Sequence, residues 1–137
     1  MKITLKHLAP YLPYGLKAKN TDSSDQKGKE WMGIKTIIGL HDETVIQSLN
    51  NFPYMIKFHI DKIKPILRPL SDYTDITSKS MSDLDCDLTD QMDIQEFALK
   101  KMSLSSLLYS SFDVLTRNHV DIFGLIPEGL AIDINTL

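Results

Sequence analysis

The middle of the chain constrains the fold most, because strand-like segments follow one another there with no helical segment between them. Ile34, Thr36, Ile38 and Leu40 lie at alternate positions, which is the period of a half-buried strand. Gly39 falls where a β-bulge or a close backbone approach is typical. Residues 55–61 show the same period. Consecutive strands joined by short turns favour an antiparallel meander over a parallel sheet.

Helical patterns occur mainly in the second half of the chain. Asp93 and Glu96 form a capping box, which predicts a short helix over about 94–101. Apolar residues that begin at Leu104 and end at Leu115 follow helical spacing, which predicts one long C-terminal helix over about 103–118. A further short helix is expected near residues 3–8, before Pro10 and Pro13.

These patterns predict an α+β fold in which a small antiparallel or mixed sheet packs against the long helix. The expected strands cover residues 16–19, 32–40, 44–49, 55–61, 64–68 and 130–134. The last of them belongs to a C-terminal segment that stays apolar almost to its final residue, which predicts a tail docked into the body of the fold. The order of the strands does not follow from the sequence.

Length and composition indicate one domain that covers residues 1–137, of which 42% are hydrophobic. No apolar run approaches the roughly 20 residues of a membrane-spanning helix, and prolines interrupt the first 16 residues where a signal peptide needs its apolar centre. We therefore expect a cytoplasmic protein with no membrane association. Cys86 is the only cysteine, which excludes an internal disulfide and a cysteine-based zinc cluster.

The charges divide unevenly along the chain. Residues 1–70 contain 11 Lys and Arg against 6 Asp and Glu, whereas residues 71–137 contain 4 against 12. Such a division can create a basic binding face, but within one domain we expect the two halves to neutralise each other across the fold.

An acidic segment invites comparison with a calcium-binding loop, because Asp83, Asp85 and Asp87 alternate along it. Leu88 stands where such a loop needs glycine for its sharp turn, and Ile94 stands where it needs a bidentate glutamate. We predict no metal site here. Whether the segment 83–93 holds a cation weakly stays open.

Catalytic patterns are missing from the sequence, which has no nucleophile elbow, no phosphate-binding glycine loop and no dinucleotide fingerprint. His119 and Asp121 are the one pair that we would test as catalytic, although a histidine at the end of a helix equally suits a C-terminal cap. We expect a protein with no catalytic residue and no cofactor, and an enzyme is the third choice.

Two sets of residues are candidates for binding. Tyr11 and Tyr14 flank prolines near the N-terminus, where tyrosines either form a platform for a peptide or anchor the loop on the core. The platform favours a protein partner. The segment 51–68 mixes aromatic residues with cations, the combination that stacks bases and neutralises phosphates. Its cations are Lys57, Lys62, Lys64 and Arg68, and its aromatic residues are Phe52, Tyr54 and Phe58.

Several segments resemble a group of short uncharacterised proteins from gut Bacteroidetes genomes and their prophage-like elements. The resemblance rests on residues 6–16 (KHLAPYLPYGL), 38–40 (IGL), 64–72 (KPILRPLSD), 123–126 (FGLI) and 133–135 (DIN), whereas residues 73–102 carry no motif of that group. It implies no activity, cofactor or site residue. It implies an origin in a mobile element, where small accessory proteins that bind host or phage factors are common.

The sequence thus favours a small intracellular accessory protein that binds another protein through exposed features such as Pro10–Tyr14. The alternative is a single-stranded nucleic-acid-binding protein that uses the Lys57 to Arg68 face. The identity of the partner, the biological process and the oligomeric state do not follow from the sequence.

Overall fold

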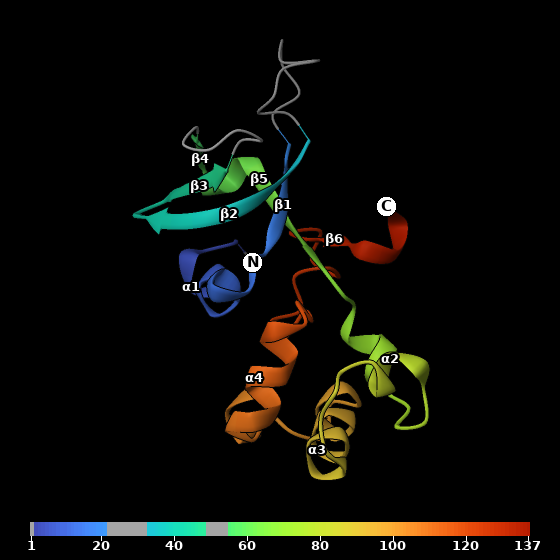
Figure 1. Ribbon diagram of the computed structural model, residues 1–137. Coiled ribbons are helices and arrows are strands. Elements are labelled where there is room, and N and C mark those ends of the chain that lie inside the picture. Colours follow the sequence, from blue (N-terminus) through green and yellow to red (C-terminus); the bar gives the residue numbers. More distant parts are fainter. Residues whose placement is uncertain (1, 22–32, 49–54) are drawn as a thin grey trace.

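The computed structural model describes residues 2–21, 33–48 and 55–137. In these residues the protein is α+β, with a mixed sheet of six strands in the order β4-β3-β2-β1-β5-β6 (Figure 1). The strands are β1 (Lys17–Asn20), β2 (Ile34–His41), β3 (Thr44–Ser48), β4 (Met55–His59), β5 (Ile63–Leu67) and β6 (Ile132–Asp133). All neighbours pair antiparallel except β5 and β6, which are parallel. The expected meander is present as β1 to β4.

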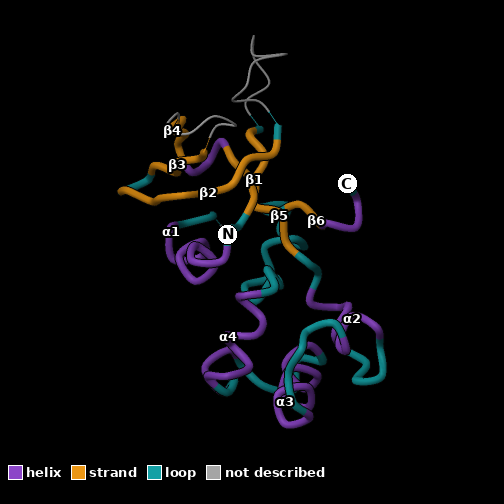
Figure 2. Tube along the Cα trace, in the orientation of Figure 1, coloured by secondary structure: helices purple, strands orange, loops and turns teal. Residues whose placement is uncertain are grey.

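The sheet coils strongly, as the link between β4 and β5 requires. The two strands stand four places apart in the sheet order, yet only the 3-10 turn Ile60–Lys62 separates them in the chain. In a flat sheet they would lie about 19 Å apart, whereas the chain from His59 to Ile63 spans at most about 14 Å. Strands β1 to β5 therefore curl into a small open barrel, in which β4 and β5 approach each other without pairing in the described residues. Figure 2 shows these strands together in the upper part of the molecule.

A β-bulge in β2 shifts the face that the sequence predicted to be buried. The pairing of β2 with β3 slips between Ile37 and Gly39, and a side chain at Gly39 would meet Ile46 at 3.4 Å. The expectation for Gly39 is thus confirmed. The extra residue changes the alternation of side chains, so Ile37 faces the core while Ile34 and Ile38 are 43% and 49% exposed.

The strand predictions agree with the structure to within a few residues, although Met32 and Leu49 lie outside the described residues. The segment 55–61 ends two residues early as a strand, because Ile60 turns into the 3-10 helix and donates its N–H to the carbonyl of Glu43. The segment 130–134 is extended only at Ile132–Asp133, where β6 pairs with the far edge of β5.

The larger helices gather at one end of the molecule, away from the barrel (Figure 1). The α-helices are α1 (Leu5–Leu8), α2 (Lys79–Ser82), α3 (Leu88–Ala98) and α4 (Tyr109–Arg117). Further 3-10 helices cover Ala9–Tyr14, Leu70–Tyr73, Leu104–Ser106 and Ile134–Thr136. The one near Ala9–Tyr14 continues α1, contains both prolines and lies between β2 and α4. We call the region from Leu70 to Arg117 the helical end.

The helix expected over 94–101 begins six residues earlier than predicted. Asp87 is its N-cap, with the Asp87 Oδ1 atom accepting the N–H of Asp90 at 2.9 Å. The carboxylate of Asp93 instead accepts the N–H of Leu108 from the next helical segment, also at 2.9 Å. A residue that matches a capping pattern thus joins two helices rather than starting one.

The prediction of a single long helix over 103–118 is wrong. Leu107 and Leu108 are extended between the 3-10 turn Leu104–Ser106 and α4. The hydrogen bond from the Leu108 N–H to the Asp93 carboxylate stabilises this extended link between the two helical segments. The side chain of Leu108 is 44% exposed. Of the expected apolar stripe, Leu115 is buried in the core, whereas Leu104, Leu107 and Phe112 are partly buried against it.

The C-terminal segment returns from α4 to the barrel. The backbone of Arg68, just past β5, pairs with Val120, and β6 pairs with β5 twelve residues later. Leu125 and Ala131 are buried in the same core as the barrel residues. The tail is therefore part of the fold, as the sequence predicted.

Candidate functional site

Tyr11 is a core residue and not part of a binding platform. Its side chain is fully buried. Its hydroxyl donates to the carbonyl of Val120 at 2.6 Å and accepts the N–H of Ile122 at 3.1 Å. Tyr11 thus ties the N-terminal segment to the C-terminal segment, which corrects its assignment as a binding residue.

Tyr14 is only partly exposed and is also engaged within the protein. Its hydroxyl donates to the Asp113 Oδ1 atom at 2.6 Å, and this bond is the main reason that the pKa of Tyr14 is raised. The backbone carbonyl of Tyr14 accepts a hydrogen bond from the ring of His119 at 2.7 Å. Pro10–Tyr14 therefore anchors α4 and the chain beyond it, the alternative use that the sequence left open.

Three of the four cations expected to share one face line different hollows of the surface. Lys57 projects from β4 beside a hollow that His41, Thr44 and Ile46 line. Lys64 lies on β5 beside Lys2, and Arg68 lines a pocket at the helical end. Lys57, Lys64 and Arg68 thus each lie at a separate hollow, and the use of the Lys57 to Arg68 face for binding stays a prediction. Phe58 is paired opposite the buried Val45, and Phe52 and Tyr54 lie outside the described residues.

A different set of cations comes together on β1 and β5. Lys17 and Lys19 project from the exposed side of β1, whose other residues are buried. The register places Lys64 directly opposite Lys19, and directly paired residues point to the same face of a sheet. Lys62, exposed, precedes β5 by one residue. We call Lys17, Lys19, Lys62 and Lys64 the lysine face.

The lysine face carries no ion-paired acid among the described residues, although Asp61 lines the same hollow as Lys64. The ion pairs of that part of the chain involve none of its four lysines. Like charges directly opposite each other in an antiparallel pair are destabilising, and the Lys19–Lys64 pair is such an arrangement. The sheet thus holds four lysines that form no ion pair in the described residues, of which Lys64 is half-buried and the other three are exposed.

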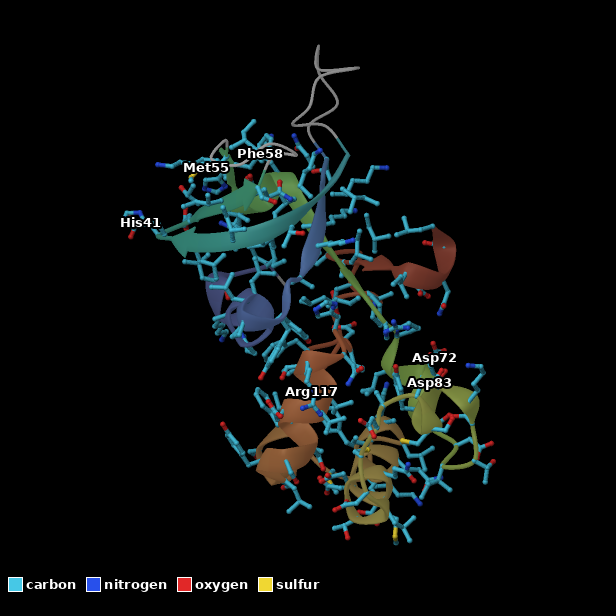
Figure 3. The ribbon with its side chains drawn as sticks, viewed as in Figure 1. His41, Met55, Phe58, Asp72, Asp83 and Arg117 are labelled. Carbon is cyan, nitrogen blue, oxygen red and sulfur yellow. The ribbon has the colours of Figure 1, made fainter. Side chains whose placement is uncertain are left out.

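The ion pairs also show that the two oppositely charged halves do not neutralise each other directly, contrary to the sequence-based expectation. His59 contacts Glu43 at 3.0 Å and Asp61 at 2.8 Å within the barrel, and these bonds raise its pKa. Arg117–Asp113 and Lys79–Asp83 pair within the helical end. In Figure 3 the labelled barrel residue His41 lies far from Asp72, Asp83 and Arg117. The described part of the molecule is therefore electrically polar, with a basic barrel and an acidic helical end.

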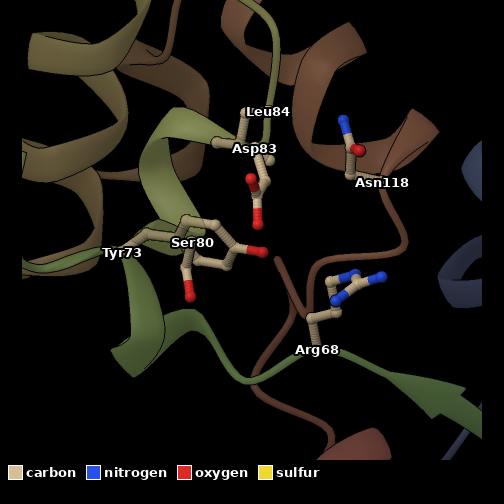
Figure 4. Close-up of a pocket in the computed structure, with 6 residues that line it drawn as sticks. All are labelled: Arg68, Tyr73, Ser80, Asp83, Leu84 and Asn118. Atoms are coloured by element: carbon tan, nitrogen blue, oxygen red, sulfur yellow. The ribbon is translucent and has the colours of Figure 1, made fainter. Parts of the chain in front are cut away.

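A polar pocket of about 110 Å³ lies between the end of β5 and α2. Figure 4 shows the carboxylate of Asp83 and the hydroxyl of Tyr73 directed into it, with the guanidinium of Arg68 and the amide of Asn118 on the opposite side. Ser80 and Leu84 complete the lining. Burial raises the pKa of Tyr73 to about 12, so its hydroxyl is protonated at neutral pH.

A larger, mostly apolar groove of about 390 Å³ lies between the 3-10 turn Leu70–Tyr73, the end of α3 and the C-terminal segment. Ala98, Ile126 and Pro127 contribute apolar surface to it. Its polar lining includes Asp121, whose two carboxylate oxygens each accept a backbone N–H at 2.8 Å, from Leu125 and Ile126.

His119 and Asp121, suggested as a catalytic pair, instead form hydrogen bonds with backbone groups. Asp121 holds the turn at Leu125 and Ile126, while His119 contacts the carbonyl of Tyr14. Within residues 2–21, 33–48 and 55–137, no group of three or more acidic, histidine or cysteine side chains could hold a metal ion. Burial raises the pKa of the Cys86 thiol, which opposes a nucleophilic role. No helix in the described residues could span a membrane.

Comparisons with known proteins found no match to this chain among protein-family models, curated proteins or solved structures.

The sequence analysis missed Lys17 and Lys19. Their spacing of two residues within a strand did carry a signal, since alternate lysines in a predicted strand share one face. What the sequence does not contain is the register that places Lys64 beside them.

Proposed function

We propose that this protein is a small accessory protein, without catalytic activity, that binds single-stranded nucleic acid through the lysine face. The observation that carries the proposal is the direct pairing of Lys19 with Lys64, flanked by Lys17 and Lys62, with no acid paired to any of them in the described residues. Four lysines on a short strand pair suit the phosphates of a flexible strand. A phosphate backbone bound there would remove the repulsion between the facing lysines.

The acidic helical end restricts the surface on which a nucleic acid can bind. Residues 71–137 carry 12 acids against 4 Lys and Arg, and they repel a polyanion. A nucleic acid would therefore contact the barrel and avoid α2 and α3. Because the contacts are to phosphates, the proposal implies little sequence preference and a strong dependence on salt.

Reversing the charge at Lys19 and Lys64 together is expected to weaken binding to an oligothymidylate by at least about tenfold at low salt. The slope of log affinity against log salt should also fall by about 0.7 for each lysine removed. Fluorescence anisotropy with a labelled oligonucleotide measures both. Lys57→Glu distinguishes binding by the lysine face from binding by the Lys57 to Arg68 face. Because Lys57 lies beside a different hollow, its charge reversal should change the affinity for the oligonucleotide little.

The double reversal Lys100→Glu/Lys101→Glu is the control matched in charge, since both are exposed lysines at the acidic helical end. An equal loss for this variant and for the Lys19/Lys64 variant would indicate attraction by net charge alone. The absence of any binding at low salt would end the proposal.

A second candidate function, binding of a protein partner, is favoured by the apolar groove beside Ile126 and Pro127. Such a role also suits the mobile-element origin that the sequence resemblance implies. Ser71→Arg would fill this groove from an exposed position, and Ser106→Arg adds the same charge at an exposed site outside it. A partner recovered by cross-linking should be lost with Ser71→Arg and kept with Ser106→Arg; loss with both, or with neither, would argue against the groove.

A further inference from the structure

The polar pocket beside Tyr73 contains a hydroxyl donor that makes no hydrogen bond within the described part of the protein. Tyr73 is 3% exposed, yet its hydroxyl has no hydrogen-bond partner among the described residues. The buried polar atoms without a partner in the described residues do not include this hydroxyl, so it meets solvent through the pocket. Since the hydroxyl points into the pocket (Figure 4), a bound molecule or water is the partner that the geometry provides for.

Opposite charges face this pocket without contacting each other. The guanidinium of Arg68 forms no ion pair in the described part of the chain, although the carboxylate of Asp83 lines the same pocket. Asp83 pairs instead with the exposed Lys79 at 3.1 Å. A guanidinium on one side and a carboxylate on the other leave room for a ligand that carries both a negative and a positive group.

The size of the pocket limits the ligand. Its volume of about 110 Å³ exceeds what one water needs but lies well below the roughly 300 Å³ of pockets for drug-sized ligands. The acidic surroundings, with Asp72 next to Tyr73 in sequence and Asp83 in the lining, disfavour a phosphate dianion.

We propose that this pocket binds a small amino-carboxylate, of the size of a free glycine or alanine. The carboxylate of the ligand accepts hydrogen bonds from Arg68 and from the Tyr73 hydroxyl, and its ammonium group donates to Asp83. Ser80 and the amide of Asn118 offer further polar contacts. This inference is independent of the lysine face, because Arg68 is the only cation in the pocket lining.

The test is an NMR titration of the ¹⁵N-labelled full chain with glycine, with acetate and with inorganic phosphate. We expect glycine to shift the amide signals of Ser80, Leu84 and Asn118 at lower concentration than acetate, and phosphate to leave them unchanged. Arg68→Gln should weaken glycine binding at least about tenfold. Asp83→Asn should remove the preference for glycine over acetate. Lys64→Gln, on β5 and outside the pocket lining, should change neither the affinity for glycine nor this preference.

Tyr73→Phe keeps the buried ring and removes only the hydroxyl, so it tests the pocket without opening the core. We expect a folded protein that binds glycine several-fold more weakly. Equal binding of glycine by this variant and the parent, equal shifts with acetate and phosphate, or no shift with glycine at all would each overturn the proposal.

Discussion

A chain that ends at Gly124 is expected to lose its folded state. The truncation removes the fully buried Leu125 and strand β6, and it leaves the buried carboxylate of Asp121 without its two backbone donors. Burial of a leucine is worth about 2 kcal/mol, and each hydrogen bond to a charged group about 2 kcal/mol. These losses alone reach about 6 kcal/mol, comparable with the roughly 5–15 kcal/mol that holds a small domain together.

Circular dichroism and the soluble yield measure this effect. The matched control is a chain that ends at Ile134, because residues 135–137 are exposed and β6 is retained. We expect the control to melt cooperatively and the Gly124 truncation to aggregate. If the shorter chain stayed folded, the tail would instead be a detachable element, and its place in the core would be wrong.

The strands could be predicted from the sequence because each has its own local signal. The alternation in residues 55–61 and the turn before Thr44 both reflect contacts between near neighbours. The pairing of β5 with β1 is different, since it joins residues more than forty positions apart. It depends on the coiling of the sheet, which a single β-bulge near Gly39 influences and no local pattern states.

The helical predictions failed where a local pattern competed with a contact made elsewhere. Asp93 and Glu96 match a capping box, but Asp87 caps the helix and Asp93 binds Leu108. That same bond interrupts the apolar stripe that predicted one long helix. A capping pattern and an apolar stripe give only the local tendency of one segment to form a helix. The hydrogen bond between a carboxylate of one segment and the backbone of another outweighs that tendency here.

The candidate sites depended on distant contacts to an even greater degree. Tyr11 looked available because prolines flank it, yet its hydroxyl reaches residues more than a hundred positions away. The lysine face and the Arg68 pocket likewise combine residues from separate segments. The residue types in the sequence indicated which side chains could bind a ligand. The register of the strand pairing determines which of these side chains lie next to each other.

Replacing Tyr11 by phenylalanine is expected to lower the free energy of unfolding by about 2–3 kcal/mol. The change leaves the ring in place but deprives two buried backbone groups of their partner, the carbonyl of Val120 and the N–H of Ile122. Both groups lie where the C-terminal segment leaves α4, so the loss weakens the junction between the N-terminal segment and the tail. Urea denaturation measures it.

Tyr14→Phe is the matched control, since it also removes one hydroxyl but breaks a single bond to a partly exposed carboxylate. Its effect on stability should be much smaller, because water can replace the tyrosine as the partner of Asp113. Neither change should alter binding to an oligonucleotide by the folded protein. If Tyr11→Phe instead kept full stability and abolished binding of a partner, Tyr11 would belong to a binding surface, and the reading of Pro10–Tyr14 as an internal anchor would have to be abandoned.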